Sequence, residues 1–331
     1  MLHSSGTLTP FVTPTVKLSR LFAPHAAHIY AKLDLLQLSG STKERTARGL
    51  IEDLLDSGRL HTGGMIVEST SGNLGIALAR QCVVRGLRFT AVVDENANPL
   101  ALNLMRVYGA TVELVATPAD GNKLAARRRR VQDLLAEHPG SVTTNQYGSP
   151  ANPRAHFAST MPEIMAGSGG DLDYLFIATS TTGTLLGCQQ YIRAHGLDTK
   201  IVAVDSVGSV LFGGASGTRR LPGLGAGVLP ELAAAAQPDL VFQIEEIEMV
   251  HGCRLLARRE GILAGASTGA IVAAMGKLLP DLDSGARIAF MVHDTGVPYL
   301  PTVYDDDWVR ATLGADPEPG FTADPVEVPH P

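Results

Sequence analysis

The sequence predicts an α/β fold in two lobes, each built on a parallel sheet with helices on its faces. Three observations lead to this prediction. Short apolar segments of strand length alternate with segments of helical periodicity along most of the chain, a pattern typical of parallel sheets with helical crossovers. At 331 residues the chain is long for a single core, since about 150 residues per domain is usual. Its hydrophobic content of 45% is ample for burial.

The first lobe begins after Lys43, where apolar residues recur at helical spacing as far as Ser57. Strands and helices then alternate, as expected for a parallel sheet. We expect strands at residues 64–67, 89–93 and 111–115, and further helices at residues 74–84, 100–108 and 121–137.

The second lobe repeats this alternation after a polar, loop-like stretch at residues 145–150. We expect strands at residues 174–178, 200–204 and 287–292, and helices at residues 185–192, from Phe242 to Leu256 and from Gly265 onward. Three aspartates, Asp305 to Asp307, directly precede Trp308. Acids in this position favour a helix cap over a metal site.

The domain bounds follow from this alternation. We expect a smaller, mobile α/β domain at residues 46–144 and a larger α/β domain formed by residues 1–45 and 145–315. The remaining residues, 316–331, are rich in proline and acidic side chains, which predicts a flexible tail.

Composition argues against several classes of partner. The net charge of -6 gives no basic footprint for nucleic acid, and no apolar run is long enough to cross a bilayer. The three cysteines, Cys82, Cys188 and Cys253, are far apart and lack metal-ligand spacing. We therefore expect a soluble cytoplasmic protein with buried thiols and no bound metal.

Lys43 is the centre of the predicted chemistry. It follows Ser41 and Thr42, either of which is a natural N-cap, so the lysine stands at a helix start. An amine held beside a helix N-terminus and away from water tends to be neutral, because desolvation and positive partial charge both disfavour ammonium. A neutral lysine can form a Schiff base. The common alternative is a solvated lysine with no chemical role. Other residues of the chain must therefore distinguish the two interpretations of Lys43.

Three strand-to-helix turns rich in hydroxyl groups favour the chemical interpretation. The turn at residues 180–184 (STTGT) offers free backbone N–H groups and hydroxyls suited to a phosphate, although such a turn is often only a cap. A second turn spans residues 70–73, and Ser267 starts a third. Three such turns beside a helix-start lysine are hard to explain as caps alone.

Two further features have weaker signals. Arg127 opens a run of four arginines on the helix at residues 121–137. A charge run is usually a solvated face, and an anion-binding role is the less favoured alternative. Gly223, Gly225 and Gly227 alternate after Arg220 and Pro222, which predicts a tight loop that brings backbone close to a ligand rather than a dinucleotide fingerprint.

Four segments carry a specific family resemblance: residues 68–79 (ESTSGNLGIALA), 180–187 (STTGTLLG), 201–212 (IVAVDSVGSVLF) and 261–270 (GILAGASTGA). From about Thr13 to Trp308 the chain resembles the fold-type II pyridoxal-phosphate enzymes of the cysteine synthase group. Their fold is tryptophan synthase β-like, with two three-layer α/β domains. Within this group it most resembles the N-(2-amino-2-carboxyethyl)-L-glutamate synthases.

The resemblance implies roles for individual residues. Lys43 would be the Schiff-base lysine, Asn73 would contact the 3-oxygen of pyridoxal 5'-phosphate, and Ser267 would lie at its ring nitrogen. A serine there donates a hydrogen bond without protonating the ring, which makes the ring a weaker electron sink. The phosphate would be bound by Ser180, Thr181, Thr182, Gly183 and Thr184, and the substrates by Thr70, Ser71, Asn73, Gln146, Gly223 and Arg127.

The resemblance also implies a reaction. O-phospho-L-serine would lose phosphate to give an aminoacrylate, and the α-amine of L-glutamate would add to Cβ. The product would be a precursor of 2,3-diaminopropionate for a siderophore or peptide natural product, made by a cytoplasmic homodimeric transferase. The alternatives are a cysteine synthase that uses sulfide, a serine or threonine dehydratase, and a non-catalytic partner protein that kept the fold.

Two departures from the family pattern stand out. Gln37-Leu38-Ser39 precede Lys43 and Glu44 follows it, where members of the group often have asparagine-proline, glycine and aspartate. The phosphate turn has fewer glycines than cysteine synthases usually show, which favours the diaminopropionate-precursor subgroup.

Overall fold

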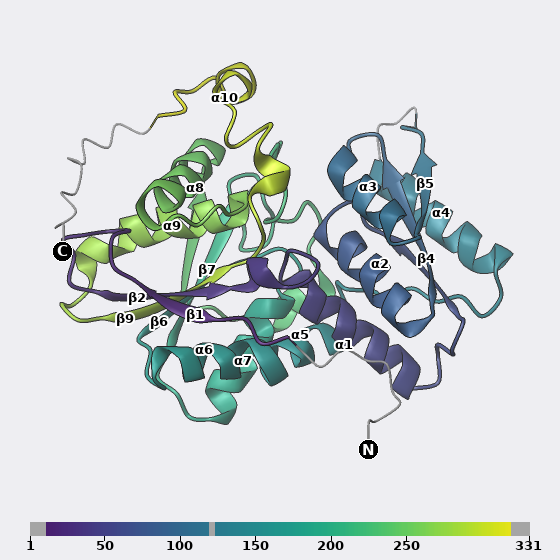
Figure 1. Cartoon of the computed structure of the whole chain (residues 1–331), viewed down its shortest axis with the longest axis horizontal. Coiled ribbons are helices and arrows are strands. Elements are labelled where there is room, and N and C mark those ends of the chain that lie inside the picture. The colour runs from purple at the N-terminus through teal and green to yellow at the C-terminus, as the bar shows by residue number, and fades with distance from the viewer. Residues whose placement is uncertain (1–10, 119–122, 319–331) are drawn as a thin grey trace.

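The computed structural model describes residues 11–118 and 123–318, and in these ranges the chain forms two sheets (Figure 1). The larger sheet has six strands in the order β1-β2-β9-β6-β7-β8, and the smaller has three in the order β3-β4-β5. The strands are β1 (Thr15–Leu18), β2 (His28–Leu33), β3 (Met65–Ser69), β4 (Arg88–Asp94), β5 (Thr111–Val115), β6 (Tyr174–Ala178), β7 (Lys200–Ser206), β8 (Leu240–Ile244) and β9 (Arg287–Val292).

Helices cover both faces of each sheet. The α-helices are α1 (Lys43–Asp56), α2 (Asn73–Arg85), α3 (Pro99–Val107), α4 (Lys123–Glu137), α5 (Ala151–Ala155), α6 (Met161–Ser168), α7 (Gly183–Ala194), α8 (Glu246–Glu260), α9 (Ala266–Leu278) and α10 (Asp306–Leu313). In Figure 1, α8 and α9 lie on one face of the larger sheet and α6 and α7 on the other, while α2, α3 and α4 surround the smaller sheet. Each sheet is therefore the middle of three layers.

The strand directions confirm the predicted parallel sheets. All pairs in the smaller sheet are parallel, and so are all pairs in the larger sheet except β1 with β2. Because the carboxyl ends of parallel strands meet at one edge, the loops that follow them gather there. The loops after β3 and β6 carry the hydroxyl-rich turns at residues 70–73 and 180–184, and Asp294 lies in the loop after β9.

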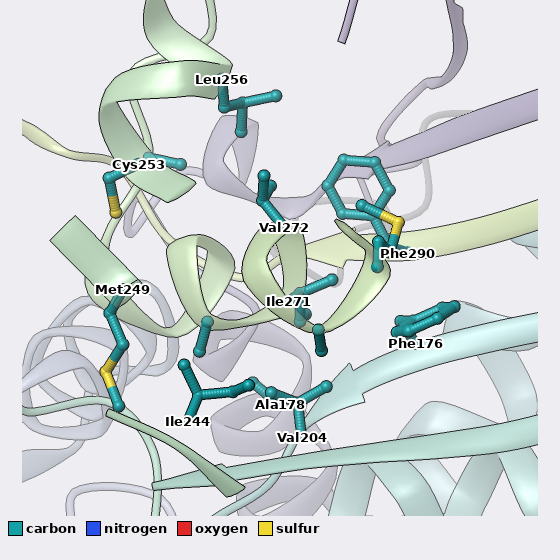
Figure 2. Packing of buried hydrophobic residues seen from close by; sticks show 14 of the residues in the cluster. Phe176, Ala178, Val204, Ile244, Met249, Cys253, Leu256, Ile271, Val272 and Phe290 are labelled. Carbon is teal, nitrogen blue, oxygen red and sulfur yellow. The ribbon is translucent and has the colours of Figure 1, made fainter. Parts of the chain in front are cut away.

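The main core lies where α8 and α9 cover the larger sheet (Figure 2). Side chains such as Ile271 and Val272 of α9 are buried against Phe176 and Phe290 of the sheet. Gly269 lets α9 touch α8, because a Cβ added there would stand 2.0 Å from the carbonyl oxygen of Met249. This close packing fixes the start of α9, where Ser267 lies.

The structure differs from the predicted elements in its shorter pieces. Phe242 belongs to strand β8, not to a helix, because β8 pairs in register with β7 at the sheet edge. Its sequence, LVFQI, is mostly apolar, but its first four side chains are exposed or half-buried because the strand lies at the sheet edge. Strands β1 and β2 and the helical residues 151–168 were also missed by the sequence reasoning. The predicted cap is confirmed, since the Asp305 carboxylate accepts from the backbone N–H of Trp308 at 2.7 Å.

The predicted domain bounds at residues 46 and 144 stay a prediction. Of the predicted tail, residues 319–331 lie outside the described residues. Among the described residues, no helix combines the length and the apolar character needed to cross a membrane, and no group of three or more histidine, cysteine, aspartate or glutamate residues could hold a metal ion.

Candidate active site

A cavity of about 1200 Å³ opens between the helices and loops of the two sheets. This volume is slightly above the usual range for small-molecule sites. Every residue that the sequence predicted for the site lines it: Lys43, Thr70, Ser71, Asn73, Arg127, Gln146, Ser180, Thr181, Thr182, Gly183, Thr184, Gly223 and Ser267. Folding thus brings together segments that are up to about 220 residues apart.

Lys43 is the first residue of α1, as predicted, and Thr42 is at the N-cap position. The expected side-chain cap is absent, however, because Thr42 has helical φ and ψ instead of the extended conformation that a capping side chain needs. The hydroxyls of Ser41 and Thr42 are both buried without a hydrogen-bond partner. The turn is held instead by its backbone, since the Thr42 N–H donates to the carbonyl oxygen of His293 at 2.8 Å.

The Lys43 amine has a lowered pKa. Its side chain keeps some accessible surface because it borders the cavity, yet it lies deep enough for desolvation to disfavour the charged form. Burial is the largest cause of the shift, and the negative charges of Asp294 and Asp34 oppose it. A lowered pKa increases the fraction of neutral amine, which is the form that acts as a nucleophile and base.

A buried ion network holds the first turn of this helix in place. Arg45 lies 2.9 Å from Asp34 and 2.6 Å from Glu163, and Lys32 also pairs with Glu163. Thr13 donates to Asp34 at 2.6 Å. Because Asp34 is on the chain that leads into α1, the network fixes the helix start against the larger sheet.

Asp294 is the functional residue that sequence reasoning missed most clearly. Its Oδ2 atom accepts hydrogen bonds from Asn73 Nδ2 at 2.8 Å and from Tyr299 Oη at 2.9 Å, while Oδ1 is buried without a partner. Burial raises the pKa of Asp294, and the two hydrogen bonds and the Lys43 charge counteract it. The available signal was a polar pair, His293-Asp294, directly after the apolar strand β9.

His293 lines the cavity next to Asp294. Its Nε2 atom accepts from the backbone N–H of Ala178 at 3.2 Å. Burial, assisted by the positive charge of Lys43, lowers the pKa of His293 to about 3. The imidazole is therefore neutral near pH 7, and its proton is on Nδ1.

The predicted phosphate turn connects β6 to α7. Thr182 has a positive φ of 62°, and a Cβ at Gly183 would stand 2.2 Å from Asn152 Oδ1, so the turn requires glycine there. The first N–H groups of an α-helix have no partner within the helix and carry partial positive charge. The start of α7 thus presents donors suited to a phosphate.

Ser267 and Gly223 form the opposite wall. Ser267 is in the first turn of α9 and is buried. Gly223 has φ of 105°, and a Cβ there would lie 3.3 Å from Tyr299 Oη and 3.8 Å from Ser267 Oγ. The loop that contains Gly223 thus comes close to Ser267, the residue expected at the ring nitrogen of the cofactor.

Glu68 ties together the two segments that border the predicted substrate residues. It is buried at the end of β3, just before the turn at residues 70–73. Its Oε2 atom accepts from Thr143 Oγ1 at 3.0 Å, from the N–H groups of Thr144 and Asn145 at 3.1 and 3.2 Å, and from Thr144 Oγ1. The segment so fixed leads directly into Gln146.

Asn152 extends this connection to the phosphate turn. Its Nδ2 atom donates to the carbonyl oxygen of Gln146 at 2.8 Å and to Thr181 Oγ1 at 3.2 Å. Gln146 is therefore held between the turn that follows β3 and the turn that follows β6.

The arginine run on α4 is divided between the cavity and solvent. Arg127 lines the cavity and lies 3.3 Å from Asp94. Arg128 and Arg129 also border the cavity but are exposed. Arg130 pairs on the surface with Glu113 at 3.0 Å and Glu137 at 2.7 Å. The favoured solvated-face interpretation thus describes Arg130, whereas Arg127 faces the site.

The arrangement fits pyridoxal phosphate. The buried hydroxyls of Ser41 and Thr42 and the Oδ1 atom of Asp294 lack hydrogen-bond partners. These buried polar atoms are therefore free to form hydrogen bonds with a ligand. A lysine amine with a lowered pKa, a buried serine hydroxyl at a helix start and a hydroxyl-rich helix N-terminus match the aldehyde, ring and phosphate of this cofactor.

Comparisons with known proteins agree with this arrangement. A sequence model of the family described as pyridoxal-phosphate dependent enzyme matches residues 7–294. A protein of Ralstonia nicotianae named N-(2-amino-2-carboxyethyl)-L-glutamate synthase is 44% identical over 298 residues, which cover 90% of this chain and 88% of that protein. A protein of Cupriavidus metallidurans with the same name is 41% identical over 318 residues, 95% of this chain and 93% of that protein.

Solved structures give the same similarity in three dimensions. The crystal structure of O-ureido-L-serine synthase has a TM-score of 0.80 at 33% identity and covers 92% of this chain and 96% of that one. The O-acetylserine dependent cystathionine β-synthase of Helicobacter pylori has a TM-score of 0.80 at 28% identity, with 88% and 94% covered.

Proposed function

The chain belongs to the family of pyridoxal-phosphate dependent enzymes, and on this premise we propose that it joins O-phospho-L-serine and L-glutamate by β-replacement. The products are N-(2-amino-2-carboxyethyl)-L-glutamate and phosphate. The observation that carries the proposal is Lys43, whose amine has a lowered pKa at the wall of a cavity lined by every predicted cofactor and substrate residue. The names of the two curated relatives support the choice of product.

Lys43 would hold the cofactor through its amine, with Ser267 at the ring nitrogen, Asn73 at the 3-oxygen and the turn at residues 180–184 around the phosphate. The hydrogen bond from Asn73 to Asp294 supports this role, because it fixes the amide beside Lys43. When bound, pyridoxal phosphate supplies an electron sink for the pair left at Cα.

The substrate carboxylate would be bound by Thr70, Ser71, Asn73 and Gln146. The contacts of Glu68 and Asn152 support this grouping, because they hold Gln146 and the turn after β3 in a fixed relation. Arg127 would attract the phosphate of phosphoserine.

Proton transfer would be the work of Lys43. Once the amino group of phosphoserine has displaced Lys43 from the cofactor, the freed neutral amine would remove the proton from Cα, the Cβ–O bond would break and phosphate would leave with the bonding pair. The α-amine of glutamate then forms the new bond to Cβ and loses a proton, and Lys43 returns a proton to Cα. The smaller sheet and its helices would close over the site during these steps and exclude water that would otherwise release pyruvate.

The assembly and setting are part of the proposal. We expect a homodimer in the reducing cytoplasm, where the free, buried Cys82, Cys188 and Cys253 stay reduced. The product would serve as a precursor of 2,3-diaminopropionate for a siderophore or peptide natural product.

The test is to incubate the purified enzyme with phosphoserine or acetylserine, each with glutamate or sulfide, and to identify the products by mass. We expect the glutamate adduct from phosphoserine. Formation of cysteine alone, or of pyruvate alone, would reject the proposed reaction. The Lys43→Ala variant should release no phosphate from phosphoserine, and sustained turnover by it would disprove the assignment of Lys43.

A further inference from the structure

Arg219 is a cation at the cavity whose charge the described protein leaves unpaired. It lines the cavity and is partly buried. Its Nε atom is buried without a hydrogen-bond partner, and its Nη1 atom donates only a long hydrogen bond of 3.4 Å to the carbonyl oxygen of Leu224. Within residues 11–118 and 123–318 it forms no ion pair, although Arg127 pairs with Asp94 and Arg220 with Glu246. A partly desolvated guanidinium without a counter-ion is costly unless a ligand completes it.

The glycine loop makes room for this side chain. A Cβ at Gly225 would stand 2.3 Å from Arg219 Nη1, and one at Gly227 would stand 3.4 Å from Arg219 Nη2. The Gly225 carbonyl oxygen accepts from Ser180 Oγ at 3.0 Å, and the Gly225 N–H donates to the Thr179 carbonyl oxygen at 2.7 Å. The guanidinium therefore lies over backbone that is fixed to the end of β6.

The adjacent backbone is also held firmly, so Arg219 has a defined place. The Leu221 N–H donates to Glu246 Oε1 at 2.6 Å, and the Arg220 N–H donates to the same oxygen. Arg219 interacts electrostatically with Asp205, but among the described residues the two make no ion pair, and Asp205 Oδ2 is itself buried without a partner. The charge of Arg219 remains available to the cavity.

Arg219 lines the same cavity as Tyr147 and arginines of α4. The charges of Arg127, Arg128 and Arg219 all act on the Tyr147 hydroxyl, and all four residues line the cavity. The first substrate's phosphate and carboxylate already have assigned partners in the proposed function. The second substrate, glutamate, brings two further carboxylates, one on Cα and one on the side chain, and neither has an assigned partner.

We propose that Arg219 forms a subsite that binds the side-chain carboxylate of a dicarboxylic amino acid, the second substrate. This inference rests on the proposed function and names the group that selects the nucleophile. A charge-assisted hydrogen bond from a guanidinium to a carboxylate is short and strong. Its loss should raise KM for glutamate on the order of 10- to 100-fold.

The experiment compares wild-type enzyme with Arg219→Ala and Arg219→Lys, and with Arg220→Ala as the matched control, since Arg220 borders the same cavity but is paired with Glu246. Phosphate release from phosphoserine alone measures the first half-reaction. Steady-state kinetics with glutamate and with glutamine then measure selection of the nucleophile, because glutamine differs only in the side-chain carboxylate.

We expect Arg219→Ala to release phosphate at the wild-type rate, to raise KM for glutamate and to lose the preference for glutamate over glutamine, with partial recovery in Arg219→Lys. Arg220→Ala should keep the preference. A slower first half-reaction would assign Arg219 to the phosphate instead, and an equal loss for glutamate and glutamine would assign it to the α-carboxylate. Either result overturns the inference.

Binding of glutarate, measured by calorimetry, tests the subsite without the reaction. Wild-type enzyme should bind this dicarboxylate at least 10-fold more tightly than Arg219→Ala, on the order expected for one charge-assisted contact. Equal binding overturns the inference. Wild-type enzyme that binds glutarate through Arg219 but forms no glutamate adduct would instead reject the proposed function and leave the dicarboxylate subsite supported.

Discussion

His156 should make the free energy of unfolding depend on pH in a range where most side chains do not titrate. The residue is fully buried between α1 and α7. Its Nε2 atom lies 3.0 Å from Thr46 Oγ1, and its Nδ1 atom lies 2.8 Å from Thr160 Oγ1. Burial, followed by the positive charges of Lys43 and Arg45, lowers the pKa of His156 to about 3. The folded protein therefore keeps this imidazole neutral at pH values where the unfolded chain protonates it.

The magnitude follows from linkage. A histidine in the unfolded chain has a pKa of about 6.5, so below that pH the unfolded state binds one more proton than the folded state does. Each pH unit then costs about 1.4 kcal/mol, and lowering the pH from about 7.5 to about 5 removes about 2 kcal/mol of stability. His293, whose pKa is likewise lowered to about 3, should remove a similar amount, which gives about 4 kcal/mol for the two residues.

The assay is chemical denaturation of the wild type and His156→Gln at both pH values, at one fixed cofactor concentration. Glutamine can still hydrogen-bond to the surrounding threonines, Thr46, Thr160 and Thr184, but does not titrate. The loss of stability should therefore fall from about 4 to about 2 kcal/mol. His138→Gln is the matched control, because His138 is exposed, and it should behave as the wild type does. The same pH-dependent loss in His156→Gln as in the wild type would refute the reasoning.

Two substitutions test the parts that position the site. Glu68→Gln weakens the acceptor of the hydrogen bonds that fix the segment before Gln146. KM for phosphoserine should therefore rise about 10-fold, with little change in the midpoint of thermal unfolding. A lower midpoint with an unchanged KM would mean that Glu68 has only a structural role. Asp34→Asn breaks a buried pair with Arg45 and should lower the free energy of unfolding by about 3 kcal/mol or more. Although burial opposes ionisation, the Arg45 charge lowers the pKa of Asp34 to about 2. The stability that this pair gives the wild type should therefore be present above about pH 4 and be lost as the pH falls toward about 2. Asp34→Asn should not show this loss, and denaturation curves of both proteins over this pH range test the difference.

Prediction from the sequence worked where the signal was local. The strands at residues 111–115 and 174–178 agree with β5 and β6 to the residue, because short runs rich in apolar and β-branched residues and bounded by turns are typical of strands. It failed at β8, where the residues from Phe242 onward were assigned to the helix that follows, although the strand's residues LVFQI are mostly apolar. A short apolar run can belong to a strand or to a helix, and only the pairing of β8 with β7 distinguishes the two here.

The sequence by itself determined the alternating fold, the position of Lys43 at a helix start and the hydroxyl-rich turn at residues 180–184, because each depends on the backbone and on residues a few positions away. Only the tertiary structure decided that Asp294 accepts from Asn73 across 221 positions of the chain, and that Arg219 has no counter-ion among residues 11–118 and 123–318. The physical reason is that hydrogen bonds and desolvation depend on which groups packing brings together. The chemistry of Lys43 arises in the same way, since its pKa is lowered by burial in a cavity that exists only after both lobes have folded.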